Sequence, residues 1–531
     1  MRAKNQPHEF ELKFTGRAGD LAAMKKAVDA QASGRVSWST SDLHATYYDT
    51  PDHRLFGKGV SFRVRRSGEK FVQAVKVNDD AGGAALNRAE WEQDLVGPEP
   101  DLTIVPQDAR RALGTVLPGE LTPVVEVRVT RKMAVILREN TFGPDLEVEV
   151  AIDRGTVSAA GKSKRLSECE LELLHGEPSA FFQMAVEVLG ESCARLSRTS
   201  KSAKGFALYN DAKPEAIRAP KFLLERDQTV SDALREIFGT CIANIVDNEP
   251  AALDGTDPEG VHQIRVSIRR MRSTLTILNK WLDPERVDWL REELKWLHLA
   301  MGPARDWDVF ITETLATVDG YGIDSESIEG LRKLAETRRK EAYQLVRDTI
   351  DSNRYARLIL RLTAFFETEG WLSRPITGHH PLIKPLRVHA GSMLSRPYRK
   401  LLKEGENLAE METEQRHDAR IRLKKLRYAV DFLHNLYPGG RTKKFLKNLQ
   451  NLQGQFGYLN DVAQIRHMID ELFEKGGRQA RNDTKLYTAA GLIMGWHAQH
   501  LHALEAHFLE CWSTFAKTPP FWLGKGKTGI P

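Results

Sequence analysis

Charged and apolar residues alternate along several short segments in the first two hundred residues of the chain. Side chains of a β-strand point alternately to opposite faces, so this period predicts strands with one buried face. Alternation of this kind, or a short β-rich run, occurs at 8–14, 61–65, 71–77, 124–130, 147–150 and 168–173. Only 20–32, 107–113 and 178–189 have a helical period in this half. We therefore expect an antiparallel sheet large enough to curl into a barrel.

The period changes after a linker that contains two prolines. Long segments rich in Leu, Arg, Glu and Ala follow, and their spacing predicts an all-α region. A stretch rich in Pro and Gly, 370–385, divides this region into two parts. The predicted organisation is a β domain over 1–210, a linker over 211–224, a helical domain over 225–515 with repeats at about 225–370 and 385–515, and a tail over 516–531.

The two helical parts repeat a basic motif. His262, Arg265, Arg269 and Arg272 have the same spacing as His417, Arg420, Lys424 and Arg427. At roughly 100° per residue, each set lies within an arc of about 80° on one helix face. Like charges three or four positions apart repel one another, so helix stability alone does not explain these stripes. They are either a solvated surface or a binding surface for an anionic partner.

Composition narrows the class of protein. The chain has 531 residues, of which 41% are hydrophobic and 28% charged, as in a soluble protein with more than one domain. The first 210 residues balance in formal charge, so the net charge of +5 belongs to the helical half. The N-terminus has no apolar signal core, and the four cysteines form no CxxC pair. We expect a cytoplasmic protein that neither enters a membrane nor carries a zinc site.

The charges on the predicted strands are segregated by sign. Carboxylates share one face at 9 and 11, at 147, 149 and 153, and at 168, 170 and 172, while Arg63 and Arg65 share a face of another strand. A solvated outer face is one explanation for any single strand. If these faces served only for solubility, positive and negative side chains would be mixed on each of them, because like charges on one face repel. Segregation instead suits a site that holds a polyanion together with a divalent cation.

These motifs resemble the CYTH domain, or triphosphate tunnel metalloenzyme, family. The similarity starts at Glu9-x-Glu11-x-Lys13 and covers about 200 residues in the family's order. It includes Tyr47-Tyr48-Asp49-Thr50-Pro51, Gly59 to Arg65, the strand of Lys76, Arg88-Ala89-Glu90-Trp91-Glu92, Thr130-Arg131, Val150 to Gly155, Glu168 to Leu173 and Ser200-Lys201-Ser202. The resemblance implies an eight-stranded antiparallel tunnel lined with charge.

The resemblance also implies roles for individual residues. Those expected to bind a triphosphate are Lys13, Arg63, Arg65, Lys76, Arg128, Arg131 and Lys201. Those expected to hold Mg²⁺ or Mn²⁺ are Glu9, Glu11, Asp153, Glu168 and Glu170. Glu9, Glu11, Lys13 and Lys76 are the expected catalytic set. By general phosphoryl-transfer chemistry, metal and basic side chains would stabilise the charge on the transferred phosphate.

The helical half resembles the CHAD domain, which often follows a CYTH domain. The similarity rests on the two histidine-headed stripes and on Gly302-Pro303-Ala304-Arg305-Asp306-Trp307-Asp308-Val309. The second copy of the last motif departs from the pattern, since Asn460 stands where the first copy has Arg305. The resemblance implies binding of inorganic polyphosphate by the eight stripe residues and association with polyphosphate granules.

Three hypotheses follow for the whole chain. The first is a metal-dependent inorganic triphosphatase that converts tripolyphosphate to pyrophosphate and phosphate, with a helical domain that binds polyphosphate. The second keeps the tunnel but makes it a class IV-type adenylyl cyclase or a thiamine triphosphatase. The third is a non-catalytic polyphosphate-binding scaffold. Nucleic acid is disfavoured as a ligand, because no aromatic residues are interleaved with the basic stripes. The sequence does not set the oligomeric state.

Overall fold

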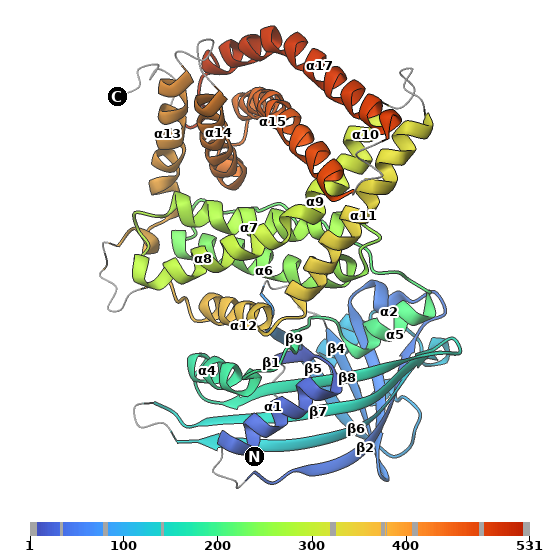
Figure 1. Cartoon of the computed structure of the whole chain (residues 1–531). Helices are drawn as coiled ribbons and strands as arrows, with labels where there is room; N and C mark the ends of the chain where they lie inside the picture. The colour runs from blue at the N-terminus through green and yellow to red at the C-terminus, as the bar shows by residue number, and fades with distance from the viewer. Residues whose placement is uncertain are drawn as a thin grey trace. The chain divides into compact units, whose positions relative to one another are not determined.

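The computed structural model describes residues 8–31, 36–77, 83–139, 143–318, 325–372, 378, 380–405, 413–476 and 483–523. The chain forms two compact units (Figure 1). The β unit comprises Met1–Arg218, Phe238–Gln263 and Asp348–Gly370, and the helical unit comprises Ala219–Ile237, Ile264–Arg347 and Trp371–Pro531. Two segments from the helical half of the sequence thus belong to the β unit.

The β unit is built on one antiparallel sheet of nine strands. Their order is β5-β4-β3-β2-β6-β7-β8-β1-β9. The strands are β1 (His8–Thr15), β2 (Ser39–Asp49), β3 (Val60–Ser67), β4 (Lys70–Val77), β5 (Leu86–Leu95), β6 (Thr122–Arg138), β7 (Leu146–Ala159), β8 (Lys162–His175) and β9 (Arg195–Leu196). The predicted antiparallel β domain is therefore confirmed.

Strand β1 pairs with β5, which stands at one end of this order, in addition to its neighbours β8 and β9. Its first half pairs with β5 from His8 to Glu11, and its second half pairs with β8 from Glu11 to Thr15. The sheet has one strand more than the expected eight. The additional strand, β9, has only two residues and pairs with Phe14 and Thr15. A strand of that length cannot show an alternating pattern, which is why the sequence did not reveal it.

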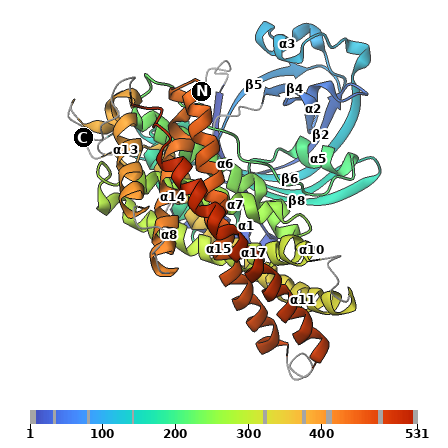
Figure 2. The same ribbon diagram turned by 90° about the horizontal axis from the view of Figure 1, so that it is seen from above.

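Short helices cover the sheet (Figures 1 and 2). Helices α1 (Ala18–Gln31) and α4 (Pro178–Leu189) pack on each other and on β8, while α2 (Arg54–Gly57) and α3 (Gln107–Leu113) lie near β3 and β4. Helix α5 (Lys201–Tyr209) packs on β6, β7 and β8, where Phe206 joins the apolar cluster around Val125 and Val127. The three helices predicted in this half correspond to α1, α3 and α4.

The β unit also contains helix α12 (Asn353–Glu367) and most of α6 (Val230–Asp254). Both hold the segment that leads from α4 to α5. Arg195 forms ion pairs with Glu249 on α6 at 3.8 Å and with Asp351 before α12 at 3.1 Å. Arg198 pairs with Asp247 on α6 at 3.3 Å. These contacts fix the backbone just before Lys201.

The helical unit is all-α, as predicted. Besides the first turns of α6, it contains α7 (Glu259–Ile277), α8 (Pro284–Ala300), α9 (Gly302–Val309), the π-helix η3 (Phe310–Thr314), α10 (Leu315–Thr317), α11 (Ser325–Ile350), α13 (Leu386–Gly405), α14 (Thr413–Leu433), α15 (Gly440–Lys475) and α17 (Thr484–Ala516). Within the described residues, no helix is both long enough and apolar enough to cross a membrane.

Aromatic side chains form the core of the last helices. Phe445 on α15 contacts Phe515 on α17 and also Phe521 and Trp522, which follow α17. Phe521 and Trp522 are buried. The beginning of the expected tail, up to residue 523, therefore packs against the helical unit.

Candidate active site in the β unit

The inner face of the sheet encloses a cavity of about 580 Å³. Most of the residues that line it are polar, and they come from the eight strands β1 to β8 and from the start of α5. The charged residues that line it are Glu9, Glu11, Lys13, Arg63, Arg65, Lys76, Glu90, Glu92, Arg131, Glu149, Glu170, Glu172 and Lys201. A charged cavity of this size suits a small, highly charged ligand better than an apolar one.

Basic residues of β3 and β4 pair with carboxylates of β1 and β5 on one side of the cavity. Lys76 and Glu90 are direct cross-strand partners, and their charged atoms lie 2.6 Å apart. The Lys76 ammonium also lies 3.1 Å from Glu9. Arg63 and Arg65 approach one oxygen of Glu92, at 3.1 and 3.2 Å. Three cations are thus lined up along one wall.

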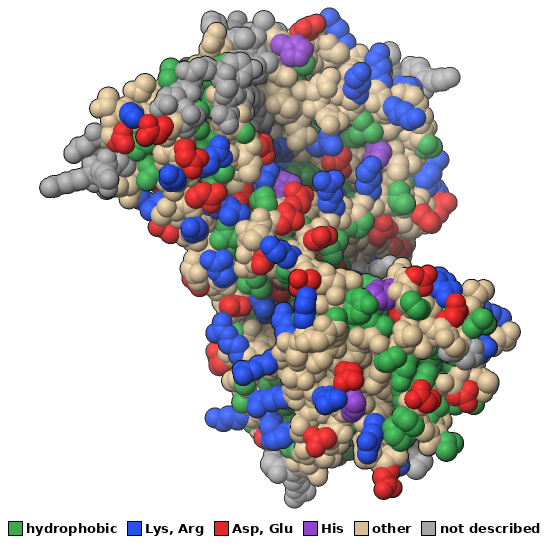
Figure 3. All heavy atoms as spheres, turned by 90° about the vertical axis from the view of Figure 1, so that its right-hand side faces the viewer, with side chains coloured by type: hydrophobic (Ala, Val, Ile, Leu, Met, Phe, Trp, Pro, Cys, Tyr) green, Lys and Arg blue, Asp and Glu red, His purple; other side chains and the backbone are tan. Residues whose placement is uncertain are grey.

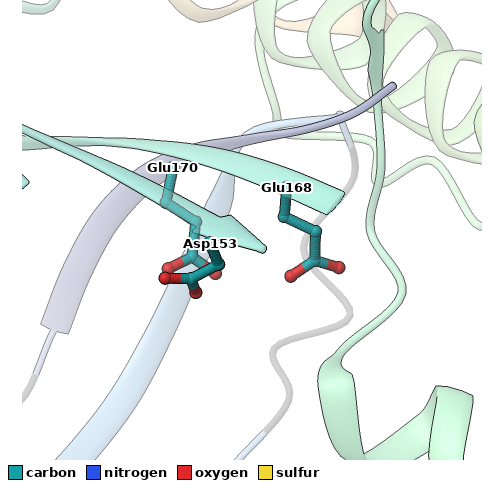
Figure 4. Close-up of side chains that lie close together, drawn as sticks. All are labelled: Asp153, Glu168 and Glu170. Carbon is teal, nitrogen blue, oxygen red and sulfur yellow. The ribbon is translucent and has the colours of Figure 1, made fainter. Parts of the chain in front are cut away.

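Three carboxylates gather on β7 and β8 at the other side of the site. Asp153 and Glu168 are cross-strand partners, and Glu170 lies two residues along β8. Figure 4 shows the three side chains directed toward one space, and one oxygen of each lies within 4.8 Å of the others. Asp153 and Glu168 are 1% and 0% exposed, so these two carboxylates are removed from water, whereas Glu170 lines the cavity.

Four cations surround the carboxylate triad. Arg131 donates two hydrogen bonds of 2.7 Å to Asp153 and one of 2.8 Å to Glu170. Lys201 contacts all three carboxylates, Lys204 donates to Glu168, and Lys13 lies 3.7 Å from Glu170. Buried charges persist only when they are paired in this way.

The pKa shifts reflect this pairing. Burial alone would raise the pKa of Glu168, but Lys201, Lys13 and Lys204 together lower it to about 2. The same kind of pairing holds the pKa of Glu170 well below its ordinary value, despite its burial. On the other wall, burial and a hydrogen bond with Glu90 raise the pKa of Glu9 to about 8. Glu168 and Glu170 are therefore ionised at neutral pH, while Glu9 holds its proton more tightly than an ordinary glutamate does.

The carboxylate triad fits a hard divalent cation. Mg²⁺ and Mn²⁺ prefer oxygen ligands, and three neighbouring carboxyl groups supply them here. Oxygen Oε2 of Glu168 is buried and accepts no hydrogen bond from the described residues, although the Lys201 ammonium lies 3.0 Å away. A buried carboxylate oxygen that accepts no hydrogen bond is a candidate ligand for a metal ion.

The structure brings most of the expected site residues together. All the expected triphosphate-binding residues except Arg128 line the cavity. The expected metal ligands divide into the carboxylate triad and two residues of β1, since Glu9 pairs with Lys76 and Glu11 lines the cavity elsewhere.

Arg128 is the expected site residue that the structure places elsewhere. Its side chain is 66% exposed and pairs with Glu126 on the outer surface of β6. Arg128 and Arg131 are separated by an odd number of positions, so the alternation of side chains along a strand directs them to opposite faces. Assigning Arg128 to the cavity was therefore wrong.

Glu90, Glu92 and Lys204 are among the charged residues in contact with the site that were not assigned a role from the sequence. Glu90 and Glu92 lie opposite Lys76 and Ala74, a register that only strand pairing reveals. Lys204 follows Lys201 by one α-helical turn and so reaches the same carboxylates. A helix prediction over 201–209 would have identified Lys204.

The basic stripes lie on α7 and α14 of the helical structure. Arg265 donates a hydrogen bond of 3.0 Å to the carbonyl oxygen of His298 on α8. Burial and the charges of Arg265, Arg272, Arg269 and Lys424 lower the pKa of His298 to about 3. Three residues of the first stripe and Lys424 of the second therefore act electrostatically on His298.

The remaining stripe residues differ in their surroundings. His262 and Arg420 are half-buried. The Nε of Arg427 donates hydrogen bonds to both carboxylate oxygens of Asp431, at 2.8 and 2.9 Å. The side chain of His417 lies outside the described residues. On the face drawn in Figure 3, Lys and Arg side chains are interspersed with Asp and Glu. That face therefore presents no continuous basic patch.

Asp308, in the motif that follows α8, has a structural role. It is buried and accepts hydrogen bonds from Arg339 at 2.7 Å and Tyr343 at 2.9 Å, both on α11. These bonds tie α9 to α11. Asp306, by contrast, interacts electrostatically with Arg265.

Comparison with known proteins agrees with this architecture. Residues 7–206 match the family model of the CYTH domain, and residues 236–470 match that of the CHAD domain. The chain combines a CYTH domain with a CHAD domain. The cavity and the carboxylate triad lie in the CYTH domain, and the two basic stripes lie in the CHAD domain.

Known relatives are distant. An inorganic triphosphatase of Haemophilus influenzae is 26% identical over 172 residues, which cover 31% of this chain and 46% of the relative. This chain thus spans less than half of that relative's length. An uncharacterised protein of Mycobacterium tuberculosis is 24% identical over 378 residues, or 64% of this chain and 67% of the relative. Among solved structures, the CHAD domain of Ricinus communis is 29% identical, with a TM-score of 0.47 over 57% of this chain and 98% of that one.

Proposed function

We propose that the CYTH domain is a metal-dependent inorganic triphosphatase that hydrolyses tripolyphosphate to pyrophosphate and phosphate. The observation that carries this proposal is the cavity of about 580 Å³, which is lined by basic side chains and which the carboxylate triad reaches through Glu170. A linear triphosphate carries several negative charges in a small volume, and this lining complements them. The similarity to an inorganic triphosphatase supports the same choice.

The basic residues of the cavity would bind and orient the phosphate chain. Arg63, Arg65 and Lys76 lie on one wall, and Arg131 and Lys201 border the carboxylate triad. Water attacks the terminal phosphorus, the bridging P–O bond breaks, and pyrophosphate leaves with the bond's electron pair. Fixed cations stabilise the charge that builds up on the leaving group and on the transferred phosphoryl group.

The carboxylates would hold the divalent cation. Glu168 is the best placed, because its Oε2 accepts no hydrogen bond from the described residues, whereas Asp153 and Glu170 both accept hydrogen bonds from Arg131. A bound Mg²⁺ or Mn²⁺ would supply Lewis-acid stabilisation of phosphate oxygens. Arg131, held in one orientation by Asp153, would in turn point its remaining donors at the substrate.

Phosphate release from a set of substrates tests this proposal. With Mg²⁺ or Mn²⁺, the full-length protein should release phosphate from tripolyphosphate faster than from ATP or thiamine triphosphate. Glu9→Ala should reduce the rate by about a hundredfold or more, as expected when a group that shapes transition-state electrostatics is lost. Glu126→Ala is the matched control, because Glu126 pairs with Arg128 on the outer surface of β6. Its rate should stay within about twofold of wild type, as for surface changes.

Other outcomes would identify the alternatives. Formation of cyclic AMP from ATP would favour the adenylyl cyclase hypothesis, and preference for thiamine triphosphate would favour the thiamine triphosphatase hypothesis. Absence of hydrolysis with retained binding of tripolyphosphate would favour the non-catalytic scaffold.

For the CHAD domain, we propose binding of inorganic polyphosphate. The supporting observation is that residues of both basic stripes act electrostatically on His298. Arg265→Ala together with Arg420→Ala should weaken polyphosphate binding. The slope of the logarithm of the binding constant against the logarithm of the salt concentration should fall by about one unit per arginine removed, as for phosphate contacts in nucleic-acid complexes. The control, Arg286→Ala with Lys475→Ala, removes the same charge from two exposed ion pairs. Equal binding by both double variants would contradict the assignment to the stripes.

A further inference from the structure

The ammonium group of Lys201 lies at the centre of the carboxylate triad. Its Nζ is 3.0 Å from Asp153 Oδ2, 3.0 Å from Glu168 Oε2 and 2.6 Å from Glu170 Oε1. The space shared by these three carboxylates is where a divalent cation would be expected. In this structure a side chain of the protein provides the positive charge there.

Lys201 also stands between the carboxylates and the cavity. Glu170 and Lys201 line the cavity, whereas Asp153 and Glu168 are buried behind them and are not part of the lining. A cation arriving through the cavity therefore meets the ammonium of Lys201 before it meets Glu168.

The position of Lys201 is set by the backbone. Lys201 is the first residue of α5, and Ser200 caps this helix by accepting a hydrogen bond of 3.1 Å from the backbone NH of Ala203. On the other side, Arg198 is paired with Asp247 of α6. Because Ser200 and Arg198 fix the backbone before Lys201, a movement of the ammonium group requires only that the long side chain of Lys201 change its conformation.

The positive charges around the carboxylate triad affect how strongly it can bind a metal ion. The three carboxylates are already contacted by four cations, namely Arg131, Lys201, Lys204 and Lys13. A divalent cation added to a set that is already neutralised would be repelled at short range by the ammonium groups. One of them must move away, and Lys201 is the one that touches all three carboxylates.

We propose that Lys201 occupies the divalent-cation position in the ligand-free protein and is exchanged for the metal when triphosphate binds. The phosphate chain offers Lys201 a new anionic partner, which frees the carboxylates for the metal. Metal and triphosphate then strengthen each other's binding, because coupling between two ligands is reciprocal. This inference rests on the metal site of the proposed function. It adds that the site is closed by an internal cation until substrate is present.

Binding of Mn²⁺ alone, without any phosphate, tests this inference. Isothermal titration of the full-length protein should give weak binding for wild type and binding tighter by about tenfold or more for Lys201→Met, a factor within the usual range of coupling between sites. Lys162→Met is the control, because Lys162 pairs with Asp211 outside the cavity. It should bind Mn²⁺ as wild type does. Equal or weaker binding by Lys201→Met would overturn the proposal.

A second measurement covers the case in which Lys201→Met does not fold. In wild-type protein with isotopically labelled lysine side chains, the NMR signal of Lys201 should shift when Mg²⁺ and tripolyphosphate are added together, and much less when Mg²⁺ is added alone. Lys201→Arg should retain weak Mn²⁺ binding, because it keeps the charge. A full shift of the Lys201 signal with Mg²⁺ alone would contradict the coupling to triphosphate.

These outcomes separate the inference from the proposed function. Metal-dependent hydrolysis of tripolyphosphate together with unchanged Mn²⁺ binding in Lys201→Met would leave the function standing and refute the exchange. Tight Mn²⁺ binding by Lys201→Met, together with an absence of tripolyphosphate hydrolysis by the wild-type protein, would support the internal cation and refute the triphosphatase.

Discussion

At the scale of single residues, Arg131 and Arg128 show how much depends on which face of a strand a residue occupies. Both lie on β6, three positions apart. Arg131 lines the cavity and is fixed by Asp153 and Glu170, whereas Arg128 is exposed beside Glu126. The two arginines have the same chemistry but face different environments.

Replacing each arginine in turn should therefore give different results. Arg131→Ala should lower kcat/KM for tripolyphosphate by about a hundredfold or more, because a fixed positive charge next to the phosphate is lost. Arg128→Ala should change kcat/KM by less than about twofold, as for surface substitutions. Steady-state kinetics with saturating Mg²⁺ measures both. A comparable loss in the two variants would contradict the placement of Arg128 outside the cavity.

The same residues show what the sequence can and cannot predict. Alternation placed Lys13, Arg63 and Arg65 on the charged faces of their strands, since a strand's own period gives the face, and the family resemblance supplied their role. The partners of these residues depend on register between strands, and register is not visible within one strand. Thus Glu90 opposite Lys76, and Asp153 between Arg131 and Glu168, emerge only from the folded sheet.

At the scale of elements, α5 positions two lysines of the site. It packs so closely on β6 that Gly205 leaves no room for a side chain. A Cβ atom there would lie 2.1 Å from Val125 Cγ1 and 2.5 Å from Val125 Cγ2. The glycine thus sets the distance between α5 and the sheet, and through it the reach of Lys201 and Lys204.

Gly205→Ala should push α5 away from β6. We expect a loss of stability of roughly 1–3 kcal/mol, typical of overpacking, and a higher KM for tripolyphosphate because the two lysines are displaced. Gly19→Ala is the control, since Gly19 lies in α1 with nothing within 4 Å of the added atom. Its stability should be equal to or slightly above that of wild type. Thermal unfolding and steady-state kinetics give the two readouts. An unchanged melting temperature for Gly205→Ala would show that α5 is not held at this distance.

Helices α6 and α12 hold the segment before α5 through a buried carboxyl group. Glu249 on α6 accepts a hydrogen bond of 2.7 Å from Tyr355 on α12 and lies 3.8 Å from Arg195. Burial, opposed by Arg195 and Tyr355, raises the pKa of Glu249 from 4.5 to about 7. The folded β unit therefore binds this proton more tightly than the unfolded chain does.

This shift makes the stability of the β unit depend on pH. Between pH 4.5 and about 7, the folded state holds more protons at Glu249 than the unfolded state, so stability falls as pH rises through this window. At about 1.4 kcal/mol per pKa unit, the effect is on the order of 3 kcal/mol. Glu249→Gln, which is neutral at every pH, should lack this contribution, so the variant should be less pH-dependent than wild type between pH 5 and 8. Calorimetry at several pH values measures the difference. Identical pH profiles would rule out a proton at Glu249.

At the scale of the whole molecule, the compact units do not follow the change from strands to helices in the sequence. The sequence correctly predicted a β half followed by a helical half. It could not show that Phe238–Gln263 and Asp348–Gly370 join the β unit. Such an exchange depends on contacts between residues far apart in the chain, such as that of Asn353 with the carbonyl oxygens of Gly190 and Ser192. Periodicity reports only local structure.

The helical unit should respond to pH in the opposite direction from the β unit. Burial and four neighbouring cations lower the pKa of His298 from 6.5 to about 3. Between these values the unfolded chain holds more protons at His298 than the folded unit does, so stability falls as pH decreases from about 6.5. The groups that face His298 are Arg265, Arg269, Arg272 and Lys424. A bound polyanion would offset their charge and so reduce the acid sensitivity.

Two calorimetric comparisons test this prediction. As pH is lowered from 6.5 to 5, wild type should lose more stability in the helical unit than His298→Gln, whose side chain does not titrate. Adding inorganic polyphosphate at pH 5 should narrow the difference, because anionic oxygens near the stripes let His298 accept a proton. Arg265→Ala should have a similar effect without any ligand, since it removes a neighbouring positive charge. If wild type and His298→Gln lose stability equally on acidification, then the residues of the two stripes do not act together on His298, and the proposed polyphosphate site loses its structural basis.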